Sequence, residues 1–324
     1  MNEAFPFVWR APFRACPLRK RVTPKYEVAN TPQPLALPCQ GGGTIKDGGR
    51  VVRRSLYVKS FNFNNKVAII TGGSSGIGKA LATELIKKYN CRVFAIARNE
   101  ERLRLVKEEL GEKYVPTPFD VCLEENWQAF AQKLKNDGVR VDILINCAGI
   151  LPKFIPFEKS NPQSLKSVFD INFFSCVYSC HHTRELMENG GMIVNISSAS
   201  ALCPFSGVSA YSSSKSALDR FSTALAYEYK EISVTTALPG FVKTDIMKNQ
   251  NASNKDKSLI DKFSANPNKI AKKILKKAGK RKKRVILGFD GKLLDFMYKH
   301  FPSLAPSLIG KFLKKSGLEL FSEL

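Results

Sequence analysis

From Lys66 onward, short apolar runs alternate with longer segments whose apolar side chains recur at helical spacing. The apolar runs predict strands at Val67–Thr71, Arg92–Ala97, Tyr114–Asp120, Asp142–Asn146, Met192–Ser197, Ser233–Leu238 and Arg284–Leu287. The segments between them predict helices at Lys79–Tyr89, Glu100–Gly111, Glu124–Asp137, Ser164–Glu188 and Tyr211–Lys230. Apolar strands joined by helix-sized connections are typical of a parallel sheet covered on both faces. The pattern therefore predicts an α/β fold with a doubly wound parallel sheet in three α/β/α layers.

Residues 1–60 lack this alternation. They contain prolines at positions 6, 12, 17, 24, 32, 34 and 38, a glycine run at 41–43, and eleven Lys/Arg residues against three acids. This composition predicts a disordered, basic N-terminal extension ahead of a main domain at 61–290. Two alternatives stay open, a targeting segment and a stretch that precedes the true translation start.

After the main domain, residues 291–324 predict a helical C-terminal tail. It contains two short amphipathic helices interrupted by Pro302 and Pro306. Apolar side chains beside lysines share one face of the second helix, namely Leu308, Ile309, Phe312 and Leu313. Such a face suits attachment to an anionic membrane surface. Packing against the domain or a neighbouring subunit is the alternative.

The formal net charge of +23 lies largely outside the central motifs, with ten basic residues and no acid between 269 and 284. We expect that segment to form a solvated helix face and turn. Nucleic acid is not an expected partner, because no basic platform with interleaved aromatic residues is present. Eight scattered cysteines without a C-x-x-C pair predict free thiols and a cytoplasmic location, with peripheral membrane association as the variant. Three histidines predict no metal site, and no apolar run approaches the roughly 18 residues of a membrane span.

A glycine-rich turn joins the first predicted strand to the first predicted helix. It reads Thr71-Gly72-Gly73-Ser74-Ser75-Gly76-Ile77-Gly78. Glycines permit a tight turn and let the backbone approach a pyrophosphate, which then lies at the positive N-terminus of the helix. The turn therefore predicts a dinucleotide-binding site.

The end of the second predicted strand bears on which dinucleotide binds. An acid there would bind the ribose hydroxyls and repel a 2′-phosphate. This chain has Ala97-Arg98 instead, and a guanidinium can bind that phosphate. NADP(H) is therefore the predicted cofactor, and NAD(H) is the alternative.

Ser198, Tyr211 and Lys215 form a second chemical pattern. A tyrosine and a lysine four residues apart lie on the same face of a helix. A free phenol has a pKa of about 10, and the charges of Lys215 and an oxidised nicotinamide would lower it. The phenol could then exchange a proton with a substrate oxygen that accepts a hydrogen bond from Ser198. The three residues predict interconversion of a carbonyl and an alcohol.

With these motifs, the chain resembles the short-chain dehydrogenase/reductase family over about residues 64–290. The matching motifs come in the family's order: TGGSSGIG, Phe119-Asp120-Val121, Asn146-Cys147-Ala148-Gly149, Asn195-Ile196-Ser197-Ser198, Tyr211 to Lys215, and Pro239-Gly240-Phe241-Val242-Lys243-Thr244. The resemblance implies a single-domain Rossmann fold and a nicotinamide cofactor. Two positions depart from the family: Cys147 replaces a usual asparagine, and Ala199-Ser200-Ala201 follows Ser198 without a nearby glycine.

The resemblance also implies roles for individual residues. Asp120 and Val121 would contact the adenine ring, and Asn172 would hold a relay water. Three residues after the fourth strand would close the floor of the cofactor cleft, namely Asn146, Ala148 and Gly149. The backbone after Pro239, with Gly240, Val242 and Thr244, would orient the nicotinamide carboxamide, and Lys215 would bind its ribose.

We therefore expect an NADP(H)-dependent oxidoreductase that reduces a hydrophobic ketone of lipid, steroid or 3-oxoacyl type, with Tyr211 as general acid/base. The candidate pocket walls are apolar, although several could instead fill the core: Ile150, Leu151, Phe154, Phe157, Leu202, Phe205, Phe241, Ile246 and Met247. The polar stretch Lys248–Asn268 predicts a lid. By resemblance, the long helix from Tyr211 would form a dimer or tetramer surface. The alternative function is a non-catalytic NADP(H)-binding sensor or scaffold.

Overall fold

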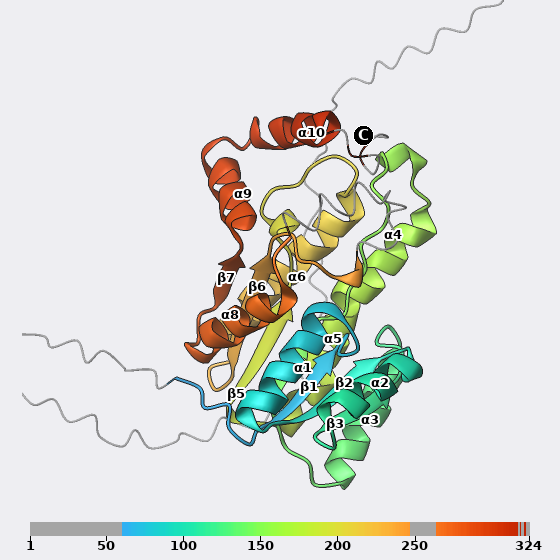
Figure 1. Ribbon diagram of the computed structural model, residues 1–324, viewed down its shortest axis with the longest axis vertical. Coiled ribbons are helices and arrows are strands. Elements are labelled where there is room, and N and C mark those ends of the chain that lie inside the picture. The colour runs from blue at the N-terminus through green and yellow to red at the C-terminus, as the bar shows by residue number, and fades with distance from the viewer. Residues whose placement is uncertain (1–59, 247–263, 317, 319–320, 322–324) are drawn as a thin grey trace, which may run out of the picture. The chain divides into compact units, whose positions relative to one another are not determined.

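The computed structural model describes residues 60–246 and 264–316, together with 318 and 321 (Figure 1). The predicted disordered extension, 1–60, lies outside the described residues up to position 59, and the predicted lid, Lys248–Asn268, lies outside them up to position 263. The predicted boundaries 61–290 and 291–324 stay predictions.

The described strands form a seven-stranded parallel sheet in the order β3-β2-β1-β4-β5-β6-β7. Their bounds are β1 (Val67–Thr71), β2 (Arg92–Ala97), β3 (Tyr114–Pro118), β4 (Val141–Asn146), β5 (Met187–Ile196), β6 (Ser233–Pro239) and β7 (Arg284–Leu287). All the predicted strands are present. The strand order reverses between β1 and β4, so the chain winds outward in both directions from the middle of the sheet. The predicted doubly wound α/β fold is confirmed.

Helices cover both faces of the sheet (Figure 1). On one face, α1 (Gly76–Tyr89), α2 (Glu100–Leu110) and α8 (Pro267–Gly279) contribute to a single buried cluster. On the other face, α3 (Glu124–Asn136), α5 (Ser175–Thr183) and α6 (Ser209–Glu228) contribute to a second cluster. The remaining helices are α4 (Pro162–Phe169), which precedes α5 in the chain, and α9 (Phe289–His300) and α10 (Ala305–Lys315), which follow β7.

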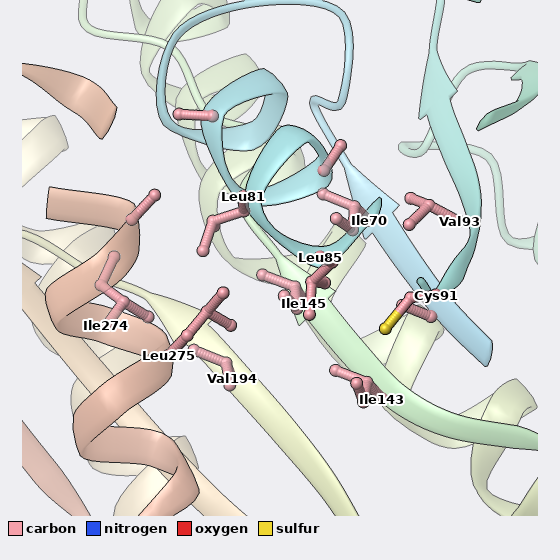
Figure 2. Packing of buried hydrophobic residues seen from close by; sticks show 14 of the residues in the cluster. Ile70, Leu81, Leu85, Cys91, Val93, Ile143, Ile145, Val194, Ile274 and Leu275 are labelled. Atoms are coloured by element: carbon pink, nitrogen blue, oxygen red, sulfur yellow. The ribbon is translucent and has the colours of Figure 1, made fainter. Parts of the chain in front are cut away.

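Neighbouring residues of the central strands point into opposite clusters, because side chains alternate along a strand. In β1, Ala68 and Ile70 are buried on the side of α1 and α8, whereas Ile69 is buried on the side of α3 and α6. Figure 2 shows side chains of α1 and α8 meeting over the strand residues of the first cluster, with Leu85 and Leu275 labelled among them. Burial on both faces explains why the strands are continuously apolar in sequence.

The lysine-rich segment before β7 is a helix with one buried face. Ile270, Ile274 and Leu275 of α8 are buried, while its lysines at 269, 272, 273, 276 and 277 are exposed. The structure agrees with the solvated basic face that the sequence predicts. It adds a buried apolar face, at helical spacing, that packs against α1.

The predicted helix Ser164–Glu188 was too long. The structure divides this stretch into α4, a π-helix η2 (Asp170–Phe174), α5 and a 3-10 turn η3 (Arg184–Leu186), and β5 already begins at Met187. The pairing of β4 with β5 runs from Val141–Met187 and resumes, after an irregularity, at Ile143–Met192. Glu188, Asn189, Gly190 and Gly191 lie in this irregularity, and the start of the strand therefore has no apolar pattern.

We predict that Ile274→Ala lowers the free energy of unfolding by about 2–5 kcal/mol, because it leaves a cavity between α8 and the sheet. Chemical denaturation measures the change. Lys273→Ala, on the exposed face of the same helix, is the control and should change stability by no more than about 0.5 kcal/mol. Equal effects of the two substitutions would contradict the buried face of α8.

Candidate active site

A cleft of about 430 Å³ lies at the carboxyl edge of the sheet, where the loops after β1, β2, β4, β5 and β6 meet. Carboxyl ends of parallel strands converge on one edge, and the reversal of strand order between β1 and β4 opens a crevice there. The glycine-rich turn and the Ser–Tyr–Lys pattern, far apart in sequence, both line this one cleft.

The glycine-rich turn lies between β1 and α1 at one end of the cleft. Gly72 has φ 68° and Gly76 has φ 53°, a left-handed conformation that favours glycine. A Cβ on Gly78 would overlap the carbonyl of Gly72. Gly72, Ser74, Ser75, Gly76, Ile77 and Gly78 all line the cleft. The N-terminus of α1 therefore points its positive partial charge at the cleft, which suits a pyrophosphate.

Ser198, Tyr211 and Lys215 line the other end of the cleft. Ser198 follows β5, whereas Tyr211 and Lys215 stand one turn apart at the start of α6. The Lys215 side chain is buried, and its Nζ donates a hydrogen bond to the Ile196 carbonyl at 3.0 Å. The Ser198 Oγ accepts a hydrogen bond from the Ser200 N–H at 3.2 Å. The structure thus brings the predicted trio together.

Burial has the largest effect on the two titratable groups of this trio. It raises the pKa of Tyr211, an effect that the hydrogen bond with Ser198 opposes. It lowers the pKa of Lys215. From the sequence we expect Lys215 and an oxidised nicotinamide together to lower the Tyr211 pKa. For the protein alone, the direction is the reverse, since loss of water disfavours the phenolate.

Asn172 is buried behind the cleft instead of lining it. Its Oδ1 accepts from the Ile150 N–H at 2.8 Å, and its Nδ2 donates to the Ile150 carbonyl at 3.0 Å and to Ser214 Oγ at 3.1 Å. Gly149 separates it from the cleft, because a Cβ there would lie 3.1 Å from Asn172 Oδ1 and 3.3 Å from Lys215 Nζ. Asn172 therefore positions the loop after β4.

Two further predicted residues, Thr71 and Asn146, are also buried behind the cleft. The Thr71 hydroxyl accepts from the backbone N–H groups of Cys147 and Ala148 at 2.9 and 3.0 Å. Asn146 accepts from Ser179 Oγ at 2.7 Å. These contacts hold the loop after β4, so that Ala148 and Gly149 line the cleft.

Two arginines line the cleft beyond the end of β2. Arg98 Nη1 lies 3.9 Å from Asp120 Oδ2, and Arg102 Nη1 lies 3.6 Å from Asp245 Oδ2. Both arginine side chains are more than half exposed, so these ion pairs are weak. The motifs identify Arg98, Asp120 and Val121, which all line the cleft, but they do not identify Arg102, which lines it too. The four-residue spacing from Arg98 into the first turn of α2 could have found it.

The loop after β6 also contributes to the cleft, which Pro239, Gly240, Val242 and Thr244 all line. The motifs do not identify the residue that binds the backbone of this loop. Asp290, in the first turn of α9, accepts a hydrogen bond from the Phe241 N–H at 2.6 Å and also lines the cleft. A Cβ on Gly240 would overlap the Asp290 carboxylate. Gly240 thus allows the close approach of α9 to this loop.

The family model described as short chain dehydrogenase matches residues 66–255, more than half of the chain. The chain belongs to the short-chain dehydrogenase family. The resemblance drawn from the motifs is confirmed.

Curated relatives of this short-chain dehydrogenase carry different names. 11-beta-hydroxysteroid dehydrogenase-like 2 of Arabidopsis thaliana is 38% identical over 192 residues, which cover 57% of this chain and 62% of the relative. 3-oxoacyl-acyl-carrier-protein reductase of Bos taurus is 34% identical over 191 residues, which cover 58% of this chain and 80% of the relative. The chain therefore spans less than two thirds of the length of the plant relative.

Solved structures share the fold. A short-chain dehydrogenase/reductase from Burkholderia phymatum in complex with NAD has a TM-score of 0.68 and 19% identity, covering 75% of this chain and 96% of that chain. A short-chain dehydrogenase from Burkholderia cenocepacia J2315 in complex with NADP has a TM-score of 0.66 and 21% identity, covering 77% of this chain and 99% of that chain. These two proteins bind different dinucleotides, so the shared fold does not decide between NAD and NADP.

The remaining wall of the cleft is apolar. Six of the nine candidate wall residues line it: Ile150, Leu151, Phe154, Phe205, Phe241 and Ile246. Leu202 is buried in a separate cluster, Phe157 is exposed outside the cleft, and Met247 lies outside the described residues. Cys147 also lines the cleft, where burial raises the pKa of its thiol to about 12 and keeps it protonated.

We predict that Gly78→Ala weakens binding of NADH or NADPH at least about tenfold, because the added methyl group forces the turn away from the helix N-terminus. Titration of nicotinamide fluorescence measures the change. Lys87→Ala, on the exposed side of the same helix, is the control, and circular dichroism checks that both variants fold. Unchanged affinity in a folded Gly78→Ala variant would contradict the assignment of the turn.

Proposed function

We propose that this protein is an NADP(H)-dependent reductase that converts a hydrophobic ketone into a secondary alcohol. The observation that carries the proposal is the single cleft at the carboxyl edge of the sheet. Its glycine-rich turn suits a dinucleotide, and its Ser–Tyr–Lys trio suits proton transfer to a carbonyl oxygen. The remaining wall of the cleft is apolar.

Each member of the trio has a separate task. A bound nicotinamide supplies the hydride that forms the new C–H bond at the carbonyl carbon. Ser198 donates a hydrogen bond to the carbonyl oxygen, and Tyr211 gives its phenolic proton to that oxygen as negative charge develops there. The raised pKa of Tyr211 keeps this proton in place before reaction. Lys215 would stabilise the resulting phenolate by its charge until solvent restores the proton.

The preference for NADP(H) rests on Arg98 and Arg102. Their carboxylate partners, Asp120 and Asp245, lie 3.9 and 3.6 Å away in exposed pairs, which a doubly charged phosphate could displace. No carboxylate follows β2 at the position of Arg98, where it would repel a 2′-phosphate. Two guanidinium groups beside one cleft therefore favour the phosphorylated dinucleotide.

The substrate class follows from the apolar wall. Phe154 and Phe205 stack with ring centroids 6.5 Å apart beside the Tyr211 side chain. Such surfaces bind extended hydrocarbon skeletons by burying apolar area. The names of two relatives, a hydroxysteroid dehydrogenase and a 3-oxoacyl reductase, support a lipid, steroid or 3-oxoacyl ketone. We also propose that the protein forms a homo-oligomer through α6, as the family resemblance implies.

We predict that Tyr211→Phe lowers kcat for ketone reduction by about 10²–10⁴-fold, because the proton donor is lost. NADPH oxidation with a cyclic ketone, a steroid ketone and a 3-oxoacyl thioester measures the change, and NADPH titration should show unchanged binding. Tyr227→Phe, an exposed tyrosine on the same helix, is the matched control. If the wild-type protein binds NADPH but reduces no ketone, a sensor or scaffold becomes the better assignment.

We predict that Arg98→Ala raises the dissociation constant for NADPH by about ten- to a hundredfold and leaves that for NADH unchanged, because only NADPH carries the 2′-phosphate. The same comparison with Arg102→Ala tests the second arginine. The control is Arg104→Ala, since Arg104 pairs with Glu101 on the outer face of α2 and does not line the cleft. Equal losses for NADPH and NADH would show that Arg98 does not select the phosphate.

A further inference from the structure

The C-terminal tail, α9 and α10 with the turn between them, builds part of the cleft with its inner side. Asp290 and Leu294 of α9 line the cleft. Leu313 of α10 and Phe321 pack in the cluster that contains Leu151 and Phe154, two residues of the apolar wall. The Phe321 ring lies 5.0 Å from the Phe154 ring, measured between centroids. The tail is therefore integrated with the substrate end of the site.

The outer side of α9 is also apolar. Phe289, Leu293 and Phe296 are exposed, and Phe289 reaches 82% exposure. Their spacing of four and three residues places them on one face of the helix. Asp290 and Leu294, which point into the cleft, lie about 100° further round the helix than Phe289 and Leu293. α9 thus has apolar side chains on two sides, and within the described residues only the inner one, Leu294, is covered.

The same arrangement continues through the turn into α10. Leu304, Leu308 and Phe312 follow one another at four-residue spacing and are exposed, Phe312 to 72%. Phe301, in the turn, is exposed as well. We call these exposed side chains of α9, the turn and α10 the tail stripe; they are Phe289, Leu293, Phe296, Phe301, Leu304, Leu308 and Phe312. Of the fourteen large exposed apolar residues in the described part of the chain, eight lie between 289 and 312, Tyr298 included. This concentration marks a binding surface.

The charges around the tail stripe are positive. Lys292 and Lys299 lie on α9, and Lys311, Lys314 and Lys315 lie on α10; all five are exposed. The acids between 289 and 316 are Asp290 and Asp295. Asp290 is turned toward Phe241 and the cleft, and Asp295 pairs with Lys299 at 2.6 Å. The apolar stripe therefore has an almost entirely cationic border.

We propose that α9 and α10 dock on an anionic lipid surface through the tail stripe. An apolar helix face bordered by lysines inserts its side chains at the boundary between headgroups and acyl chains, while the lysines meet lipid phosphates. A second copy of this chain is a poorer occupant, since it would bring the same lysines against each other. Within the described residues no helix has the length and apolar character to cross a bilayer.

The two sides of the tail give this docking a consequence for the reaction. The outer side contacts lipid, and the inner side forms part of the apolar wall around the substrate. A lipophilic ketone dissolved in the membrane would then reach the cleft beside α9 and α10 without crossing water. This delivery role rests on the proposed function, whereas the docking surface does not.

Co-sedimentation of the full-length chain with vesicles tests the surface. One set of vesicles is phosphatidylcholine, and the other is phosphatidylcholine mixed with phosphatidylglycerol. The double variant Leu293→Gln, Phe312→Gln should lower binding to the mixed vesicles at least about tenfold, because two apolar side chains no longer insert. Lys311→Gln, Lys315→Gln should lower binding to the mixed vesicles by about tenfold and leave binding to phosphatidylcholine unchanged.

The matched control is Leu105→Gln, Leu123→Gln, which removes two exposed leucines elsewhere and should bind as the wild type does. The basic segments 1–60 and 269–284 are identical in every variant. If Leu293→Gln, Phe312→Gln sediments as the wild type does, those segments carry the binding and the proposal is wrong. It is equally wrong if the wild type shows no preference for the anionic vesicles, or if it is a dimer that this variant dissociates.

Turnover is measured in the same samples with a water-soluble ketone, and the double variants should keep wild-type rates because their substituted side chains lie outside the cleft. Vesicle binding without turnover would leave the docking surface standing and remove the proposed reaction. Turnover without vesicle binding would support the proposed reaction and show that the proposed docking surface is wrong.

Discussion

The site depends on one buried line of hydrogen bonds that joins β4, β5 and α6. Asn146 Nδ2 donates to Asn195 Oδ1 at 2.8 Å, and Asn195 Nδ2 donates to Ser222 Oγ at 2.7 Å. All three side chains are buried, where an amide without a partner would be costly. The line therefore fixes α6 against the ends of two neighbouring strands. Because Ser198 follows β5 and both Tyr211 and Lys215 lie on α6, this register sets the geometry of the trio.

The glycine-rich turn is held to the same sheet by close contacts between small residues and the backbone. Thr71, the last residue of β1, accepts two backbone hydrogen bonds from the loop after β4. In that loop, Gly149 leaves room for both Asn172 Oδ1 and Lys215 Nζ. A larger residue at this position would push against the buried lysine. The turn that suits the dinucleotide and the trio that suits the proton transfer are thus held by one set of close contacts.

The sequence predicted the strands well, because strands buried on both faces carry an apolar run that no polar face interrupts. It overextended the helix to Glu188, since the π-helix at Asp170–Phe174 and the irregular start of β5 leave no periodic signal. Motifs identified Thr71, Asn146 and Asn172 but could not separate residues that line the cleft from those that support it. Asp290 and Arg102 were missed because their place in the cleft depends on the packing of α9 and α2. The direction of the Tyr211 pKa depends on burial, which spacing alone does not report.

The C-terminal tail illustrates a distinction that an amphipathic pattern cannot make. A helix with one apolar face needs one partner, and the inner side of α9 and α10 has it in the cleft wall. Exposed side chains such as Phe289 and Phe312 add nothing to that packing, and their recurrence at helical spacing forms the tail stripe that we propose docks on lipid. The hydrogen bond from the Phe241 N–H to Asp290 links both surfaces to the loop after β6. Any displacement of α9 on the proposed docking would therefore reach the loop after β6, which lines the cleft.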